Sequence, residues 1–169
     1  MAQTTFSGPV KSLAGFINAG VNTTVSLTAD TSLTVAAHAG KILLCNDADG
    51  KFTLPSIVTT APTDPTSPDQ VNNVGASFFF YIETAATDLD ILTDGTDKFK
   101  GAAMVAVDDG SKKAFFPATA NDVMTLNGST KGGIVGSIVQ VTAIDAASYL
   151  VHNTLLLGSG TIVTPFADA

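Results

Sequence analysis

Three kinds of side chain that could carry chemistry lie within residues 38–57, HAGKILLCNDADGKFTLPSI: a histidine, a cysteine and aspartates. The chain has one cysteine, Cys45, and two histidines, His38 and His152, which could supply a nucleophile and its base. Cys45 ends an apolar run, however, and a cysteine in that setting is usually a small buried residue. A zinc site would have to recruit ligands from distant segments, and their spacing does not favour one. We therefore interpret Cys45 as a core residue.

The segment NDADG (46–50) resembles the centre of a calcium-binding loop. The match fails at its ends, because Cys45 stands in the first ligand position and Ser56 stands in the twelfth, where a bidentate glutamate is needed. The dipeptide Asp49-Gly50 instead favours the tight turn of a β-hairpin that joins KILLC to KFTLP. We predict this hairpin and no metal.

Four weaker motifs also have structural interpretations. The segment GSTKGG (128–133) has the residues of a phosphate loop in the wrong order, and GSG (158–160) lacks the spacing of a nucleophile elbow. The aspartates of DDG (108–110) favour a turn, and those of DLD (88–90) favour the polar face of a strand. The sequence therefore predicts a protein that is not an enzyme and needs no cofactor.

Composition narrows the class of partner. The chain has 169 residues, which suits one domain, and a single cysteine cannot form an internal disulfide. All eight basic residues are lysines, fourteen of the fifteen acids are aspartates, and the formal net charge is −7. This balance argues against nucleic-acid binding, which uses a basic surface. The first residues lack a signal-peptide pattern and no apolar run could span a bilayer, so we expect a soluble protein made in a cytoplasm, with no membrane partner.

The apolar segments are short, rich in β-branched and aromatic residues, and separated by Gly, Asn, Asp and Pro. This pattern predicts an all-β domain over residues 21–169, an antiparallel β-barrel or sandwich, either a jelly roll or a more open barrel. The expected strands are residues 23–28, 32–37, 41–45, 51–55, 76–83, 89–93, 102–107, 113–116, 122–127, 137–144, 148–153 and 161–164.

Three segments suggest contacts or exposure. Phe78–Phe80 does not alternate with polar residues, so this strand should be covered on both faces, either inside the domain or by a neighbouring subunit. The proline-rich segment 59–73 should be a long exposed loop. Residues 1–20 contain apolar side chains broken by Gly8-Pro9 and Gly15, which favours an extended arm that binds another chain, or else the first strand of the domain.

Two stretches resemble a known family. SLTVAAHAGKILLCNDADGKFTLPSI (32–57) and VQVTAIDAASYLVHNTLLLGSGTIVTPFA (139–167) are similar to small virion structural proteins of tailed bacteriophages. The shared features are a His-Ala-Gly-basic start to a strand, an acidic glycine turn, a Thr-Leu-Pro exit and a Gly-Thr…Pro-Phe close. Such proteins are commonly capsid decoration, or cement, proteins, so the resemblance implies that the more open form of the predicted barrel or sandwich is decoration-protein-like.

The resemblance implies a protein, made in the host cytoplasm, that binds the outer surface of a virion capsid and stabilises the shell by bridging coat-protein subunits. Its partners would be the major capsid protein and itself, as a homotrimer. The alternative is a receptor- or glycan-binding head of a virion fibre. The residues expected to contact the capsid or a neighbouring subunit are apolar or aromatic: Phe6, Pro9, Val10, Leu13, Phe16, Ile17, Phe78, Phe79, Phe80, Pro165 and Phe166.

Overall fold

The computed structural model describes residues 23–60 and 72–168, and these form an almost entirely β structure, as predicted. The strands are β1 (Thr24–Leu27), β2 (Thr31–Ser32), β3 (Ile42–Cys45), β4 (Lys51–Thr53), β5 (Ser77–Ile82), β6 (Leu89–Leu92), β7 (Lys98–Gly101), β8 (Ala103–Val107), β9 (Lys112–Phe115), β10 (Val123–Leu126), β11 (Ile138–Asp145), β12 (Ser148–Gly158) and β13 (Phe166–Ala167). Helix α1 is the single turn Val35–His38.

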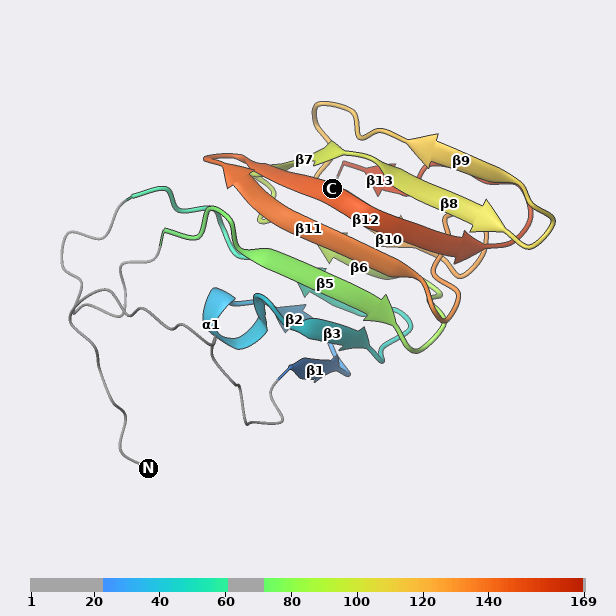
Figure 1. Ribbon diagram of the computed structural model, residues 1–169, viewed down its shortest axis with the longest axis horizontal. Helices are drawn as coiled ribbons and strands as arrows, with labels where there is room; N and C mark the ends of the chain where they lie inside the picture. The colour runs from blue at the N-terminus through green and yellow to red at the C-terminus, as the bar shows by residue number, and fades with distance from the viewer. Residues whose placement is uncertain (1–22, 61–71, 169) are drawn as a thin grey trace, which may run out of the picture.

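The strands form two sheets that pack as a sandwich. The larger sheet has the order β1-β3-β5-β11-β12-β8-β9, with β7 also paired to β12, and the smaller has the order β13-β10-β6-β4-β2. Figure 1 looks onto the larger sheet, with the smaller one behind it. Within the described residues the sheets do not close into a barrel, so the sandwich is the correct one of the two predicted forms.

In the first half of the chain the neighbouring strands are parallel, which differs from the antiparallel arrangement that we predicted. From β1 to β6 the chain alternates between the sheets, so that β1, β3 and β5 are parallel neighbours in the larger sheet and β2, β4 and β6 are parallel neighbours in the smaller. Thr24 pairs with Ile42, and Ile42 pairs with Phe79. The strand patterns in the sequence fit both arrangements, because a half-buried strand alternates in the same way in parallel and antiparallel pairs.

The prediction of a hairpin at Asp49-Gly50 is also wrong. Its two strands, β3 and β4, lie in different sheets, so the residues between them cross the sandwich instead of reversing one strand pair. Gly50 is needed for space: a Cβ atom there would lie 2.8 Å from Cζ of the Phe52 ring. The glycine thus lets the chain pass close to a core aromatic residue.

The second half of the chain is mainly antiparallel. Strand β11 pairs with β5 on one side and with β12 on the other, and β8 and β9 form a hairpin. The turn of that hairpin is the predicted one at residues 108–110, where Gly110 has φ +87° and Asp109 Oδ1 accepts a hydrogen bond from the Ser111 amide. Strands β7 and β8 both run parallel to β12, one beside each half of it.

Several element boundaries differ from the predictions. Residues 32–37 were expected to form a strand, but half of them, residues 35–37, lie in α1, whose N-cap Thr34 accepts a hydrogen bond from the Ala37 amide. The last strand lies at β13 rather than at 161–164, and β7 was not predicted. Short alanine-rich or lysine-rich segments such as these have weak local preferences, so tertiary contacts decide their structure.

One core fills the space between the sheets. The rings of Phe52, from the smaller sheet, and Phe80, from the larger, stack with centroids 6.4 Å apart. Tyr149 is fully buried, and its hydroxyl donates a hydrogen bond to the Pro55 carbonyl, which satisfies the polar end of the ring. The core is a single cluster that draws residues from both sheets.

Candidate interaction surface

The residues that suggested catalysis do not meet in the described structure. Cys45 is fully buried at the end of β3, and burial raises the pKa of its thiol from an ordinary 9.0 to about 12. His38 lies before the start of the same strand, at the end of α1, and its Nδ1 accepts a hydrogen bond from the Thr34 amide. The nucleophile candidate and this histidine thus lie at opposite ends of β3. Cys45 is the core residue that its sequence context indicated.

The aspartates near the failed calcium pattern are occupied by local contacts. Asp30 Oδ1 accepts a hydrogen bond from the Lys51 amide. Desolvation and a hydrogen bond with Asp49 raise the pKa of Asp47. In the part of the chain that the structure describes, no group of three or more His, Cys, Asp or Glu side chains could hold a metal ion. Likewise, none of the described helical residues forms a helix long and apolar enough to cross a membrane.

The predicted contact residues divide into three groups. Phe78 and Phe80 point into the core, and Pro165 and Phe166 are buried, with the Phe166 ring 6.3 Å from that of Phe99. These four contacts are therefore internal. Of the predicted contact residues that the structure describes, only Phe79 lies on the surface, where it is half-buried. The remaining predicted contacts, Phe6, Pro9, Val10, Leu13, Phe16 and Ile17, lie outside the described residues.

Phe79 belongs to a largely apolar surface on the larger sheet, which we call the outer face. Along β5, the side chains of Phe78, Phe80 and Ile82 are buried, so those between them point away from the core. Strand register extends this surface sideways: Phe79 is flanked by Ile42 on β3, and Tyr81 is flanked by Leu44 on β3 and Ile138 on β11. Leu155 on β12 continues the row from Ile138. The apolar members of the outer face are Ile42, Leu44, Phe79, Tyr81, Ile138 and Leu155.

A connected polar group lies beside these residues. The Ser77 hydroxyl accepts hydrogen bonds from Gln140 Nε2, at 2.7 Å, and from the Thr142 hydroxyl, at 3.1 Å. Thr142 Oγ1 and His152 Nε2 lie 2.9 Å apart, and Asn153 Nδ2 donates to Gln140 Oε1 at 2.8 Å. The polar side chains in the middle of the outer face thus have partners among themselves.

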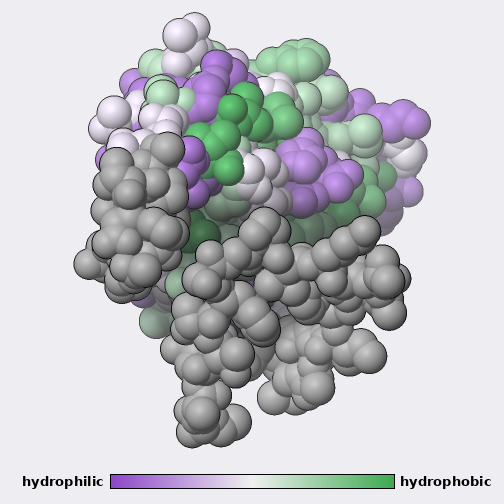
Figure 2. All heavy atoms as spheres, turned by 60° about the vertical axis from the view of Figure 1, so that its left-hand side comes forward, coloured by the Kyte–Doolittle hydropathy of each residue, from purple (hydrophilic) through white to green (hydrophobic). Residues whose placement is uncertain are grey.

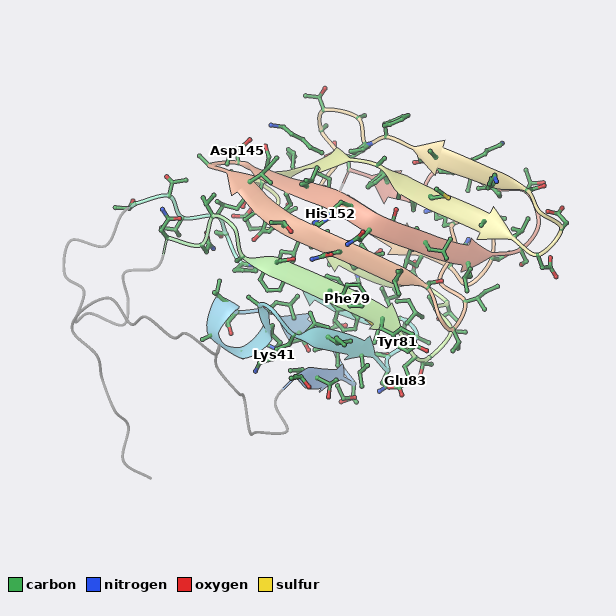
Figure 3. All side chains as sticks on the ribbon, viewed as in Figure 1. Lys41, Phe79, Tyr81, Glu83, Asp145 and His152 are labelled. Carbon is green, nitrogen blue, oxygen red and sulfur yellow. The ribbon has the colours of Figure 1, made fainter. Side chains whose placement is uncertain are left out.

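Charged groups are confined to the margins of the outer face. Lys41 immediately precedes β3 and Glu83 immediately follows β5, and Figure 3 shows them near opposite ends of these strands, with Phe79 and Tyr81 between them. At a further corner, Asp145 pairs with Lys100 at 3.0 Å, and hydrogen bonds from the Ala147 amide and from Lys100 lower the pKa of Asp145 to about 2. The central residues of the outer face include no Lys, Asp or Glu.

The sequence pattern alone would misplace the β12 part of this surface, because β12 contains an irregularity. Ile138 pairs with Leu155 and Gln140 pairs with His152, so β12 has one more residue than β11 over this interval. Asn153 takes a positive φ of +46° there. This bulge places both His152 and Leu155 on the outer face, although simple alternation would put them on opposite faces. The only sequence signal is an asparagine, which tolerates this conformation better than most residues.

A second apolar surface lies where segment 59–73 joins the domain. Asn73 is buried at this junction. Its side chain accepts a hydrogen bond from the Val58 amide and donates one to the Ser56 carbonyl. An open groove of about 320 Å³ beside it is lined by Leu33, Thr34, Val35, Ala36, Pro55, Val58 and Asn73. Figure 2 turns forward the side of the molecule that is on the left in Figure 1 and shows hydrophobic residues gathered among hydrophilic ones on that side.

Comparisons of the chain with protein-family models, with curated proteins and with solved structures gave no match. The outer face and the groove beside Asn73 are therefore interpreted from their own chemistry.

Proposed function

We propose that this chain is a non-enzymatic virion structural protein, a decoration or cement protein that binds the outer surface of a phage capsid and stabilises the shell by bridging coat-protein subunits. In this proposal its partners are the major capsid protein and further copies of itself, assembled as a homotrimer. The sequence features that resemble phage virion proteins support the proposal.

The structural observation that supports it most is the outer face. A sandwich of two sheets can bury only the inner face of each, and the larger sheet presents Ile42, Phe79 and Leu155 on its other side. Ile42 and Leu155 are 42% and 40% exposed in the chain alone. An apolar sheet face of this kind is typical of a surface that works by contact with another protein.

The proposal can be tested on virions of the phage that encodes this chain, compared with virions made without it. Electron cryomicroscopy should show density of the size of this domain on the outside of wild-type shells only. Adding the purified chain to the deficient shells should restore that density and raise the temperature at which they release DNA. Density at a fibre tip would instead support the receptor-binding alternative, and the absence of the chain from the particle would refute both.

A further inference from the structure

We propose that the outer face of the larger sheet is the surface through which copies of this chain bind one another. The inference deepens the proposed function, in which the chain self-assembles, by naming the residues that make the contact. Two features of the outer face favour a second copy over a different protein, and a third makes the face suitable for burial by another protein.

The first feature is the distribution of charge. The chain has a formal net charge of −7, so two copies repel each other over most of their surfaces. Its acids lie mainly in the turns, as at 47–49, 94–97 and 108–109, whereas the centre of the outer face carries apolar and neutral polar residues. A different partner could bring a basic surface to the acidic turns. A second copy cannot, and it therefore needs an uncharged area of contact.

The second feature is that the margins are electrostatically self-complementary. Lys41 and Glu83 form no ion pair with any described residue, and Glu83 Oε2 accepts a hydrogen bond from the neutral side chain of Asn46. Ile42 pairs with Phe79, so Glu83 lies five residues further along the strand direction than Lys41, a separation of about 16 Å at the usual rise of a strand. A second copy that brings its Lys41 end to the Glu83 end of the first satisfies both charges. Such a contact can be made in a two-fold pair or repeated around a closed three-fold ring.

The third feature is that covering the outer face would leave few polar groups without partners. Ser77, Gln140, Thr142, His152 and Asn153 are joined by hydrogen bonds with one another. Burial of a polar side chain is costly mainly when it loses water and gains no replacement partner. The network supplies replacements within the chain itself, so a flat apolar surface can be placed over it.

The central test is the mass of the full chain in solution, measured by sedimentation from about 1 to 100 μM, the range of many specific protein associations. We expect the wild type to form a defined oligomer. In Phe79→Asp the dissociation constant should rise at least about 30-fold, the effect of losing one central contact of about 2 kcal/mol. Ile42→Lys should weaken association in the same direction, and it keeps the test valid if Phe79→Asp does not fold.

Phe116→Asp is the matched control. Phe116 is 75% exposed, follows β9, and is separated from β5 by strands β11, β12 and β8. If association resulted from non-specific hydrophobic contacts of exposed aromatic residues, Phe116→Asp would weaken it too. We expect Phe116→Asp to leave the dissociation constant within about twofold of the wild type, as for residues outside the contact.

Charge exchange tests the orientation of the contact. Lys41→Glu and Glu83→Lys should each weaken association, and the double variant should recover most of the loss, because it restores opposite charges at the two ends. A wild-type chain that is monomeric at about 100 μM would overturn the inference, as would an oligomer that is unchanged by both Phe79→Asp and Ile42→Lys. An oligomer weakened by those changes but insensitive to all three charge variants would overturn the proposed orientation.

Failure of this inference is distinguishable from failure of the proposed function. A monomer that still coats capsids would retain the capsid function and assign the outer face to another protein. An oligomer held by the outer face that does not bind capsids would retain the inference and remove the capsid function. A stable dimer would support the contact while contradicting the proposed trimer.

Discussion

Cys45 ends β3 with its side chain enclosed between the sheets, and this position determines how its thiol ionises. Burial disfavours the thiolate, so the pKa rises from 9.0 to about 12 in the folded protein. Between these values the unfolded chain has released the thiol proton and the folded chain has kept it. The folded state then binds more protons, so its stability falls as the pH rises through this range.

We therefore predict that Cys45→Ala removes part of the alkaline sensitivity of the fold. At pH 7 the wild type should be the more stable, because the variant leaves a small cavity. At about pH 10.5 the wild-type advantage should be smaller by about 2 kcal/mol, since each pH unit above about 9 costs about 1.4 kcal/mol. Urea unfolding at the two pH values measures the difference. Both proteins keep Tyr149, so the ionisation of this buried tyrosine does not contribute to the comparison. An advantage that is independent of pH would contradict the burial of the thiol.

The two ion pairs among the described residues provide a second comparison at this scale. Lys98 Nζ lies 2.6 Å from Asp122 Oδ2, and the Asp122 side chain is only 5% exposed. Lys98→Met removes this ammonium group from a buried carboxylate and should lower the free energy of unfolding by about 2–3 kcal/mol. Lys100→Met is the control, because the Lys100–Asp145 pair is exposed on both sides. It should leave the midpoint of thermal unfolding nearly unchanged. Equal shifts for the two variants would contradict the assignment of Asp122 to a buried pair.

At the scale of elements, the position of most strands could be predicted but their pairing could not. Segments such as 76–83 and 137–144 are recognisable by their apolar and β-branched residues, and β5 and β11 lie mostly within them. Which sheet each strand joins depends on contacts between segments distant in sequence. For that reason the connection at Gly50, which crosses from one sheet to the other, resembled a hairpin turn in the sequence. The positions of His152 and Leu155 on the outer face depend on the bulge between them, which the sequence pattern did not reveal.

The bulge in β12 has a counterpart across the sheet. Gly101 is the last residue of β7 and has φ +98°. Beside the break between β7 and β8, Thr154 Oγ1 accepts a hydrogen bond from the Met104 amide and donates one to the Ala102 carbonyl. A Cβ atom on Gly101 would clash with the Val151 carbonyl oxygen. The glycine therefore permits two short strands to follow one bent neighbour.

We predict that Gly101→Ala destabilises the fold by about 2–4 kcal/mol, because it adds a backbone clash to an unfavourable φ. Gly110→Ala is the matched control, since Gly110 has a similar φ of +87° but a Cβ atom there would meet no other atom within 4 Å. It should cost only the conformational strain, about 1 kcal/mol. Denaturant unfolding of the two variants separates the two contributions, and equal costs would show that the close approach to Val151 is not rigid.

At the scale of the whole molecule, the single core predicts how the described residues unfold. Leu33 and Phe52 from the side of the smaller sheet and Phe80 and Val141 from the larger belong to one cluster, so neither sheet has a separate core. We expect one cooperative transition, with calorimetric and van't Hoff enthalpies in agreement. Two resolved transitions would contradict the single domain that we predicted over residues 21–169.

The predicted arm at residues 1–20 lies outside the described residues, and its role can be tested by deleting residues 2–17. The described strands begin at Thr24, beyond the end of the deletion. The deletion should therefore leave the unfolding midpoint nearly unchanged if the segment is an attachment arm. Each buried phenylalanine contributes about 1.5–3 kcal/mol, so removing Phe6 and Phe16 should weaken binding to capsids by roughly two to four powers of ten.

The two interpretations of residues 1–20 give opposite results in this experiment. Loss of the cooperative transition in the deletion variant would identify the segment as part of the domain. A folded variant that saturates capsids with wild-type affinity would exclude the arm and direct attention to the groove beside Asn73. Substituting Phe6 and Phe16 together by serine in the full chain is the matched control, because it removes the rings and keeps the length. If the rings make most of the contact, this variant should lose most of the affinity that the deletion loses, and the remainder would belong to the smaller apolar side chains Val10, Leu13 and Ile17.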